Sequence, residues 1–261
     1  MPPPPLPARP GQTGPPPIPP RPPPPGEQLP CPPSFPPVCV GRLLADGTGP
    51  QAGVVQGVKG VKWQASGLLE EGCNLPGHSV NVQRPLTIHM GPPGTTIDAK
   101  GRQRTEILSW PPSAPGETWI YKWRFHLHGP LPTSSKFFHL TQLLSRESGG
   151  FVVALGLVNG KVKISSILPP LLDAAGQPLP LPELPAEQYW NRTVYHRAVV
   201  KWGPGGSVDY TVADTATDEL LLRYAVNADV PAKGSVKCGL YRAHVCSTAT
   251  AVVGDFVFKK R

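Results

Sequence analysis

Several residues that could do chemistry lie in segments where polar side chains recur at every second position. Lys237 and Tyr241 share one face of a predicted strand, with Gly239 between them. Because a nearby cation favours the phenolate form of tyrosine, Tyr241 is a candidate for accepting and returning a proton. The glycine leaves room for another group to approach the backbone. An ordinary sheet tyrosine is the competing interpretation.

Two other segments supply hydrogen-bond donors. Arg104 and Glu106 share one face of a second predicted strand. In the segment 137–144, regular alternation turns Gln142 to one face and His139 to the other. Arg104 and Gln142 are therefore candidate ligand donors, while His139 is predicted to pack internally. The alternatives are a structural ion pair between Arg104 and Glu106 and plain cross-strand pairing of Gln142.

The elements that position these groups are predicted to be strands. In the segment 119–128 (WIYKWRFHLH), apolar side chains occupy every second position from Trp119 to Leu127. Lys122, Arg124 and two histidines occupy the alternate positions. This pattern predicts a strand with one buried aromatic face. Lys122 and Arg124 are candidates for lining a basic substrate groove, and a solvated sheet face is the alternative.

Similar alternation recurs along the rest of the chain, and glycine or proline turns separate the runs. These runs are 137–144, 150–157, 161–167, 194–202, 207–213, 219–226, 235–244 and 251–259. About a dozen strands with almost no helical periodicity favour an all-β fold, a two-sheet jelly-roll β-sandwich over residues 38–261. One sheet of such a sandwich curves, and alternate side chains on its concave outer face can reach a ligand.

Residues 1–37 form a proline-rich tail, with 20 of the 38 prolines of the chain. Such a segment buries little apolar surface and is predicted to be disordered or in polyproline II conformation. The stretches 4–9 and 16–21 fit the P-x-x-P-x-R pattern that SH3-type domains bind. An SH3-type partner of the tail is therefore one hypothesis, and a plain extension is the other.

Charge and composition narrow the function. The tail holds two basic residues and one acidic residue, which leaves 23 basic and 16 acidic residues in the body. A basic body suits a polyanionic partner, but the charges are scattered and no nucleic-acid recognition motif occurs. The chain contains neither a long apolar run nor a signal-peptide pattern, so no membrane association is expected. The five cysteines show no C-x-x-C spacing, which disfavours a zinc site.

Three motifs together resemble those of jelly-roll polysaccharide lyases. They are R-T-E at 104–106, F-H-L-x-Q at 138–142 and K-x-G-x-Y-R at 237–242. Their order is similar to that in the fungal glucuronan lyases of polysaccharide lyase family 20 and, more distantly, the alginate lyases of family 7. The resemblance covers residues 50–261 and implies a concanavalin A-like sandwich.

The resemblance implies β-elimination on a uronic-acid polysaccharide such as β-1,4-glucuronan. The C5 proton is acidic enough to remove only after the adjacent carboxylate has been neutralised. Gln142 and Arg104 match the neutralising donors, each worth about 3 to 4 kcal/mol when well placed. Tyr241 matches the base that takes the proton, and Lys237, Glu106, Arg124 and Lys122 are the expected substrate-binding residues.

The resemblance also implies a histidine near the base, for which His78 and His89 are the candidates. Cys238 stands where the pattern leads us to expect tryptophan. Asp255 is similar to an aspartate that holds a structural calcium in some jelly-roll carbohydrate enzymes, although a calcium site needs several further oxygen ligands. No cofactor is required for the reaction.

The family resemblance further implies an extracellular monomer acting on an acidic polysaccharide. Two other hypotheses come from different classes of protein. One is a catalytically silent carbohydrate-binding jelly roll, and the other is an interaction protein that acts through its proline-rich tail.

Overall fold

The computed structural model describes residues 41–261, except 74, 76–78, 92–100 and 244–246. The chain divides into two units, Met1–Pro30 and Cys31–Arg261, and every described residue belongs to the second unit. The predicted tail and its two P-x-x-P-x-R stretches lie outside the described residues, so the SH3-type partner stays a prediction.

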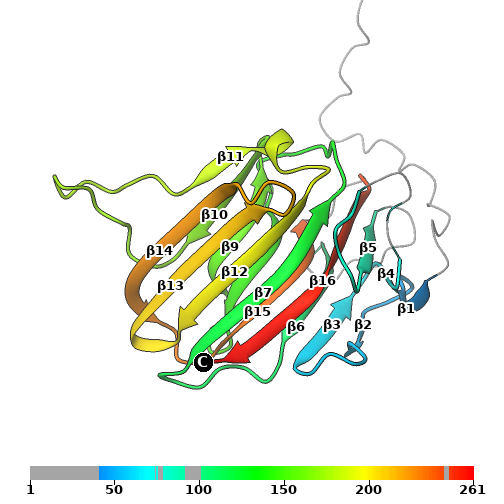
Figure 1. Cartoon of the computed structure of the whole chain (residues 1–261), viewed down its shortest axis with the longest axis horizontal. Coiled ribbons are helices and arrows are strands. Elements are labelled where there is room, and N and C mark those ends of the chain that lie inside the picture. The colour runs from blue at the N-terminus through cyan, green and yellow to red at the C-terminus, as the bar shows by residue number, and fades with distance from the viewer. Residues whose placement is uncertain (1–40, 74, 76–78, 92–100, 244–246) are drawn as a thin grey trace, which may run out of the picture. The chain divides into compact units, whose positions relative to one another are not determined.

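The described residues form two eight-stranded antiparallel sheets. Sheet A has the order β1 (Arg42–Asp46), β4 (Leu68–Glu71), β5 (Leu86–Met90), β16 (Ala249–Lys260), β7 (Thr118–Leu127), β12 (Thr193–Lys201), β13 (Gly203–Asp214) and β14 (Leu220–Val230). Sheet B has the order β11 (Glu183–Pro185), β10 (Lys161–Ser166), β9 (Phe151–Val158), β8 (Phe138–Ser145), β15 (Gly234–Ala243), β6 (Arg102–Ser109), β3 (Val61–Ala65) and β2 (Gln51–Val54). Figure 1 shows strands β14, β13, β12, β7 and β16 of sheet A as the front layer.

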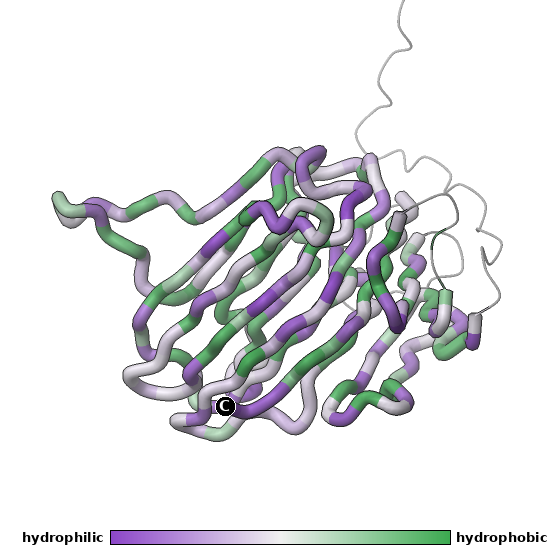
Figure 2. Tube along the Cα trace, viewed as in Figure 1, coloured by the Kyte–Doolittle hydropathy of each residue, from purple (hydrophilic) through white to green (hydrophobic). Residues whose placement is uncertain are grey.

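Alternating side chains build the core between the sheets. Tyr121, Trp123 and Phe125 of β7 are at most 1% exposed, whereas Lys122 and Arg124 between them are partly exposed. Figure 2 shows hydrophobic and hydrophilic residues following one another along the strands. A strand with this period of two buries one face and leaves the other free. The predicted all-β sandwich is confirmed.

Helices contribute almost nothing to the described part of the chain. It contains one 3-10 turn, Ala186–Gln188, and no helix long and apolar enough to cross a membrane.

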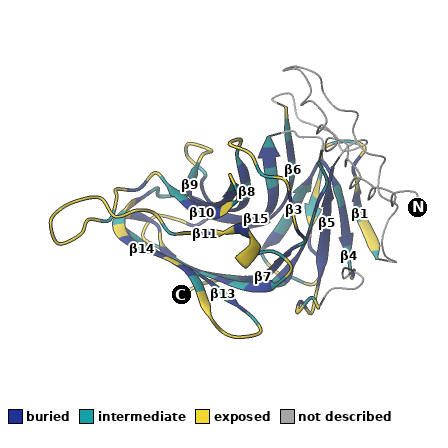
Figure 3. Cartoon of the chain, turned by 90° about the horizontal axis from the view of Figure 1, so that it is seen from above, coloured by how far each residue is buried: buried dark blue, intermediate teal, exposed yellow. Residues whose placement is uncertain are grey.

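Sheet B carries the polar strands singled out above. Strand β15 lies between β8 and β6, and β3 pairs with the other edge of β6. Figure 3 shows these strands along a curve of the sheet. Hydrogen-bonded neighbours are about 4.8 Å apart, so side chains on the shared outer face can touch from strand to strand. This face positions the candidate site.

Candidate active site

Tyr241 lies on the outer face of sheet B, directly opposite Arg104 on β6. The Arg104 guanidinium carbon lies 4.4 Å from the centroid of the tyrosine ring. Arg102 donates a hydrogen bond from Nη1 to the phenolic oxygen at 2.8 Å. Because a guanidinium can only donate, this bond strengthens when the oxygen carries negative charge. The phenol is therefore held in a cationic setting.

Glu106, two residues from Arg104, is a buried carboxylate with four polar side chains around it. It accepts hydrogen bonds from Gln142 Nε2 at 2.5 Å and Gln64 Nε2 at 2.9 Å. Lys237 Nζ and Arg104 Nε each lie 3.4 Å from Glu106 Oε2. With its side chain only 3% exposed, Glu106 organises these donors. The expected direct contact between Glu106 and a substrate does not fit this geometry, because the carboxylate is already enclosed.

Lys237 is buried beside Glu106. Burial lowers the pKa of its ammonium group, and the charges of Arg104 and Arg146 lower it further, while the Glu106 carboxylate raises it. The cluster around Tyr241 and Glu106 thus contains four cationic side chains. They are Arg102, Arg104, Arg146 and Lys237. The excess of positive charge suits an anionic ligand.

A β-bulge brings His139 into the same cluster. Strand β8 pairs with β15 as Gln142↔Lys237 and His139↔Tyr241, with a register shift between these pairs. The intervening Leu140 is buried in the core. The shift turns His139 and Gln142 to the same face, although their spacing in the sequence predicts opposite faces. The sequence interpretation of His139 as an internal packing residue is therefore wrong.

His139 adjoins the phenol rather than the sandwich interior. Its ring centroid lies 5.9 Å from that of Tyr241, edge to face. Burial lowers the pKa of the imidazole, and the Gln142 side chain and the Glu106 charge act in the opposite direction. Its Nδ1 has no hydrogen-bond partner among the described residues. His139 thus lies beside Tyr241, where the sequence analysis expected His78 or His89. Only the bulge, which leaves no clear mark in the sequence, reveals this position.

Gly239 accounts for the close packing of β15 on β6. Its φ is +138°, which side-chain-bearing residues rarely adopt. A Cβ at this position would lie 2.4 Å from the Thr105 carbonyl oxygen and 2.9 Å from Glu106 Cα. The absence of a Cβ therefore allows the backbone of β6 to lie close to Gly239. The glycine lies within the register shift between Cys238 and Tyr241.

The two expected basic substrate-binding residues of β7 lie elsewhere. Arg124 and Lys122 belong to sheet A, on the face turned away from the aromatic core. Arg124 Nη1 donates to the Asn81 side-chain oxygen at 2.6 Å and lies 3.7 Å from Asp255 Oδ2. The prediction that they line the substrate groove is not supported, because the period of two identifies a common face but not the sheet that carries it.

His89 is likewise outside the cluster. It lies on β5 of sheet A, where its Nε2 is 3.3 Å from Glu70 Oε2 and its Nδ1 is 3.2 Å from Thr250 Oγ1. Ile88 and Met90 beside it point into the core, so His89 faces the opposite side of the sandwich from Tyr241. The assignment of His89 to the catalytic group is corrected accordingly. His78 lies outside the described residues.

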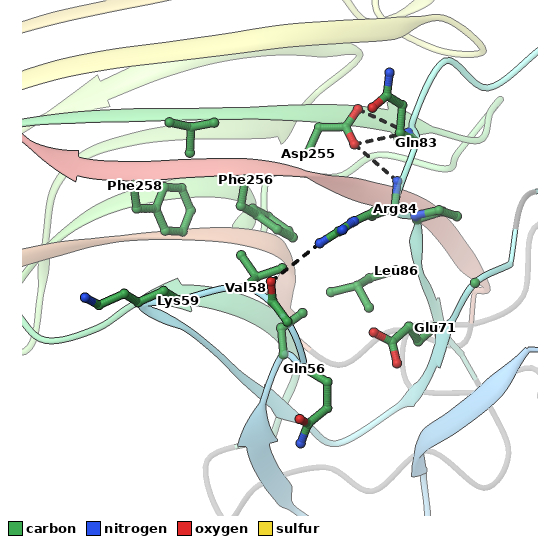
Figure 4. A pocket seen from close by; sticks show the side chains of 15 residues that line it. Gln56, Val58, Lys59, Glu71, Gln83, Arg84, Leu86, Asp255, Phe256 and Phe258 are labelled. Atoms are coloured by element: carbon green, nitrogen blue, oxygen red, sulfur yellow. Dashed lines mark hydrogen bonds between the residues drawn. The ribbon is translucent and has the colours of Figure 1, made fainter.

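Asp255 serves a structural purpose in sheet A. Its carboxylate accepts hydrogen bonds from the backbone amides of Gln83 and Arg84 at 3.1 to 3.2 Å, as Figure 4 shows. Within the described ranges, no group of three or more His, Cys, Asp or Glu residues could hold a metal ion. The structural calcium at Asp255 stays a prediction, because calcium also takes carbonyl, amide and water oxygens as ligands.

Cys238 is a buried free thiol on the inner face of β15. Burial raises the pKa of this thiol, so it remains protonated and inert. The tryptophan expected at this position would have to fit in the core, away from the outer face that carries Tyr241.

Comparison with solved structures identifies the fold. The endo-β-1,4-glucuronan lyase of the fungus Trichoderma reesei is similar over 80% of this chain and 93% of its own, with a TM-score of 0.52 and 13% sequence identity. An alginate lyase from Corynebacterium sp. matches over 82% of this chain and 95% of its own, with a TM-score of 0.47 and 14% identity. No protein-family model and no curated protein matches the sequence. The chain has a polysaccharide-lyase-like fold.

Proposed function

We propose that this protein is a polysaccharide lyase that cleaves a uronic-acid polymer, with β-1,4-glucuronan as the preferred substrate. The observation that carries the proposal is the contact of Tyr241 with Arg102, Arg104 and His139 on one outer sheet face, beside Gln142 and Lys237. The fold shared with a glucuronan lyase supports the same class of reaction.

The first requirement of the reaction is to neutralise the substrate carboxylate. Arg104 has a side chain that is 32% exposed and is therefore accessible to a ligand. Gln142 gives one amide hydrogen to Glu106, which leaves the second hydrogen for a substrate oxygen. Glu106 holds both donors in place before substrate arrives, so little reorganisation is needed as negative charge develops.

The second requirement is a base and an acid. Tyr241 enters this step as the phenolate and becomes the phenol when it accepts the C5 proton. The C5–H electrons form the C4=C5 double bond, and the C4–O bond breaks with its electrons on the glycosidic oxygen. The phenol returns a proton to the departing glycosidic oxygen, so the products are an unsaturated uronate end and a new reducing end. Arg102 stabilises the phenolate that begins and ends this cycle through its hydrogen bond. His139 lies beside the phenol, and its Nδ1 has no hydrogen-bond partner among the described residues, so it is a further candidate donor or acceptor for the substrate.

Substrate capture follows from the charge of the site. The cations around Glu106 and Tyr241 outnumber the single carboxylate. A cationic surface concentrates a polyanion and speeds its encounter with the protein. We expect the reaction to slow as salt is added, because screening weakens attraction between exposed charges.

One observation favours a second candidate function, a non-catalytic binder of acidic saccharides. Gln142 is bonded to Glu106 at 2.5 Å and the Tyr241 oxygen to Arg102 at 2.8 Å. In the second candidate function, substrate leaves these two hydrogen bonds in place. Gln142 and Tyr241 are then not available for catalysis, and the face binds polyuronate without cleaving it.

Ultraviolet absorbance of the unsaturated product distinguishes the two functions. The protein is incubated with β-1,4-glucuronan, alginate and a neutral glucan, and binding is measured in parallel by affinity electrophoresis. The lyase produces absorbance with a polyuronate and none with the glucan. Retention by glucuronan without new absorbance would leave only the binding function.

The compartment of the protein follows from the proposed substrate. We infer action outside the cell, where acidic polysaccharides occur. A disulfide at Cys73 agrees with an oxidising environment.

A further inference from the structure

A basic pocket of about 520 Å³ lies at the end of the sandwich, outside the Tyr241 cluster. Its lining includes four lysines, Lys59, Lys62, Lys259 and Lys260, and neither aspartate nor glutamate. Lys260 Nζ is paired with Glu117 Oε1 at 2.7 Å. In the part of the chain that the structure describes, the other three lysines form no salt bridge, so the pocket has a net positive charge.

Two tryptophans form apolar walls of this pocket. Trp110 is 42% exposed, and Lys62 Nζ lies 4.0 Å from the centroid of one of its rings. Trp119 is half-buried and stacks on Tyr121 with ring centroids 5.9 Å apart. An aromatic face beside a cation offers a stacking surface for a sugar ring and a partner for its carboxylate.

The pocket is continuous with a neighbouring hollow. Val58, Lys59 and Phe258 line both, and Figure 4 shows them from the side of the second hollow. The second hollow contains Asp255 and Glu71 as well as Arg84. The excess of unpaired positive charge is therefore on the Trp110 side.

A row of cross-strand neighbours joins the pocket to the candidate active site. Lys62 on β3 pairs with Leu108 on β6, Leu108 with Lys237 on β15, and Lys237 with Gln142 on β8. Lys62 and Lys237 are thus two strand spacings, or about 10 Å, apart. Arg146, which interacts electrostatically with Glu106, also lies 5.9 Å from the Trp110 ring. A bound acidic chain could extend along this row from one site to the other.

We propose that the Trp110 pocket is an accessory binding site for a uronate residue of the polymer held at Tyr241. The inference rests on the proposed function, because it concerns the same acidic saccharide. The site is built from a stacking surface and cations without an enclosed base, so it binds the chain and takes no part in elimination.

The test uses the full chain carrying Tyr241→Phe, so that substrate is not consumed during binding measurements. Lys59→Gln with Lys259→Gln removes two pocket charges, and Trp110→Ala removes the stacking surface. Lys201→Gln with Arg223→Gln, two exposed residues of sheet A, is the matched control for charge. Calorimetry measures the affinity for polymeric β-1,4-glucuronan and for its disaccharide, and circular dichroism verifies folding of each variant.

We expect each pocket variant to weaken polymer binding about fivefold, in line with the loss of partly exposed contacts. Binding of the disaccharide, which occupies the Tyr241 site, stays unchanged, as does polymer binding by the control. Equal loss for polymer and disaccharide, or no loss for either, would overturn the inference.

The parent protein separates this inference from the proposed function. If it binds polymer but yields no unsaturated product, the lyase proposal fails while the pocket variants still test the accessory site. If it neither binds nor cleaves polyuronate, both proposals are wrong.

Discussion

The side chain of Glu106 receives donors from four strands of sheet B. Gln64 comes from β3, Arg104 from β6, Gln142 from β8 and Lys237 from β15. A buried cation such as Lys237 is stable only when an anion compensates it. One carboxylate therefore fixes the positions of the groups assigned to substrate binding, and its own role is positioning.

Glu106→Gln tests this positioning role. The substitution keeps the shape of the side chain but leaves Lys237 and Arg104 without a compensating charge. We expect the free energy of unfolding to fall by roughly 3 kcal/mol, measured by urea denaturation. Glu219→Gln, at an exposed position, is the control and should change it little. Equal stability of the two variants would show that the buried carboxylate compensates nothing.

Tyr241→Phe tests the proposed base. The change removes the phenolic oxygen but keeps the ring that packs against Phe137 at a centroid distance of 5.0 Å. Turnover of glucuronan should fall at least about 100-fold, because proton transfer has no substitute at that position. Tyr195→Phe, a half-buried tyrosine of sheet A, should retain activity. A Tyr241→Phe enzyme with normal turnover would remove the phenol from the mechanism.

At the scale of elements, the β-bulge decides which residues of β8 reach the site. Gly239 supplies the backbone freedom on β15, and the register shift places His139 opposite Tyr241. Bulges redirect side chains in this way without altering the hydrophobic pattern of the strand as a whole. The composition of the site therefore depends on the pairing of two strands.

Gly239→Ala should disturb this pairing. The new Cβ would meet the Thr105 carbonyl oxygen at 2.4 Å while the backbone stays at an unfavourable φ. We expect a loss of stability of about 2 kcal/mol or more and a loss of lyase activity. Gly150→Ala is the control, because its nearest contact would be 3.7 Å away. Thermal denaturation compares the variants, and similar melting temperatures would contradict the role assigned to Gly239.

At the scale of the whole molecule, the core encloses an imidazole among aromatic side chains. His196 of β12 stacks on Trp123 with centroids 4.7 Å apart. Its ring nitrogens lie 2.8 Å from the Tyr210 oxygen and 3.1 Å from the Tyr189 oxygen. Burial lowers the pKa of His196 to about 3. The histidine is neutral in the folded protein across a wide range of pH.

This shift predicts how stability depends on pH. The unfolded chain binds a proton at His196 below its ordinary value of 6.5, whereas the folded chain binds one only near 3. The free energy of unfolding should therefore fall on acidification between these values, by at most about 1.4 kcal/mol per pH unit from this group. His196→Gln, compared by urea denaturation at several pH values, should show a weaker dependence. Identical slopes for the two proteins would refute the assignment.

Much of the architecture is readable from the sequence alone. The alternation in the segment 119–128 determines a strand with an aromatic inner face, because a strand that is solvated on one side must alternate. The same rule groups Lys237 with Tyr241, and Arg104 with Glu106, as neighbours on one face. Turn residues separate the runs and indicate an antiparallel sandwich.

Tertiary structure decided which of these polar faces meet. Alternation correctly turns Arg124, Lys122 and His89 away from the core, but their strands belong to sheet A. Alternation predicts that His139 and Gln142 face opposite sides, whereas a bulge brings both to the site. Alternation is a local property that relates residues of one strand. The sheet to which a strand belongs, and its register there, depend on partner strands that lie far along the chain. The pairing of these strands is fixed when the apolar faces of the two sheets are buried against each other.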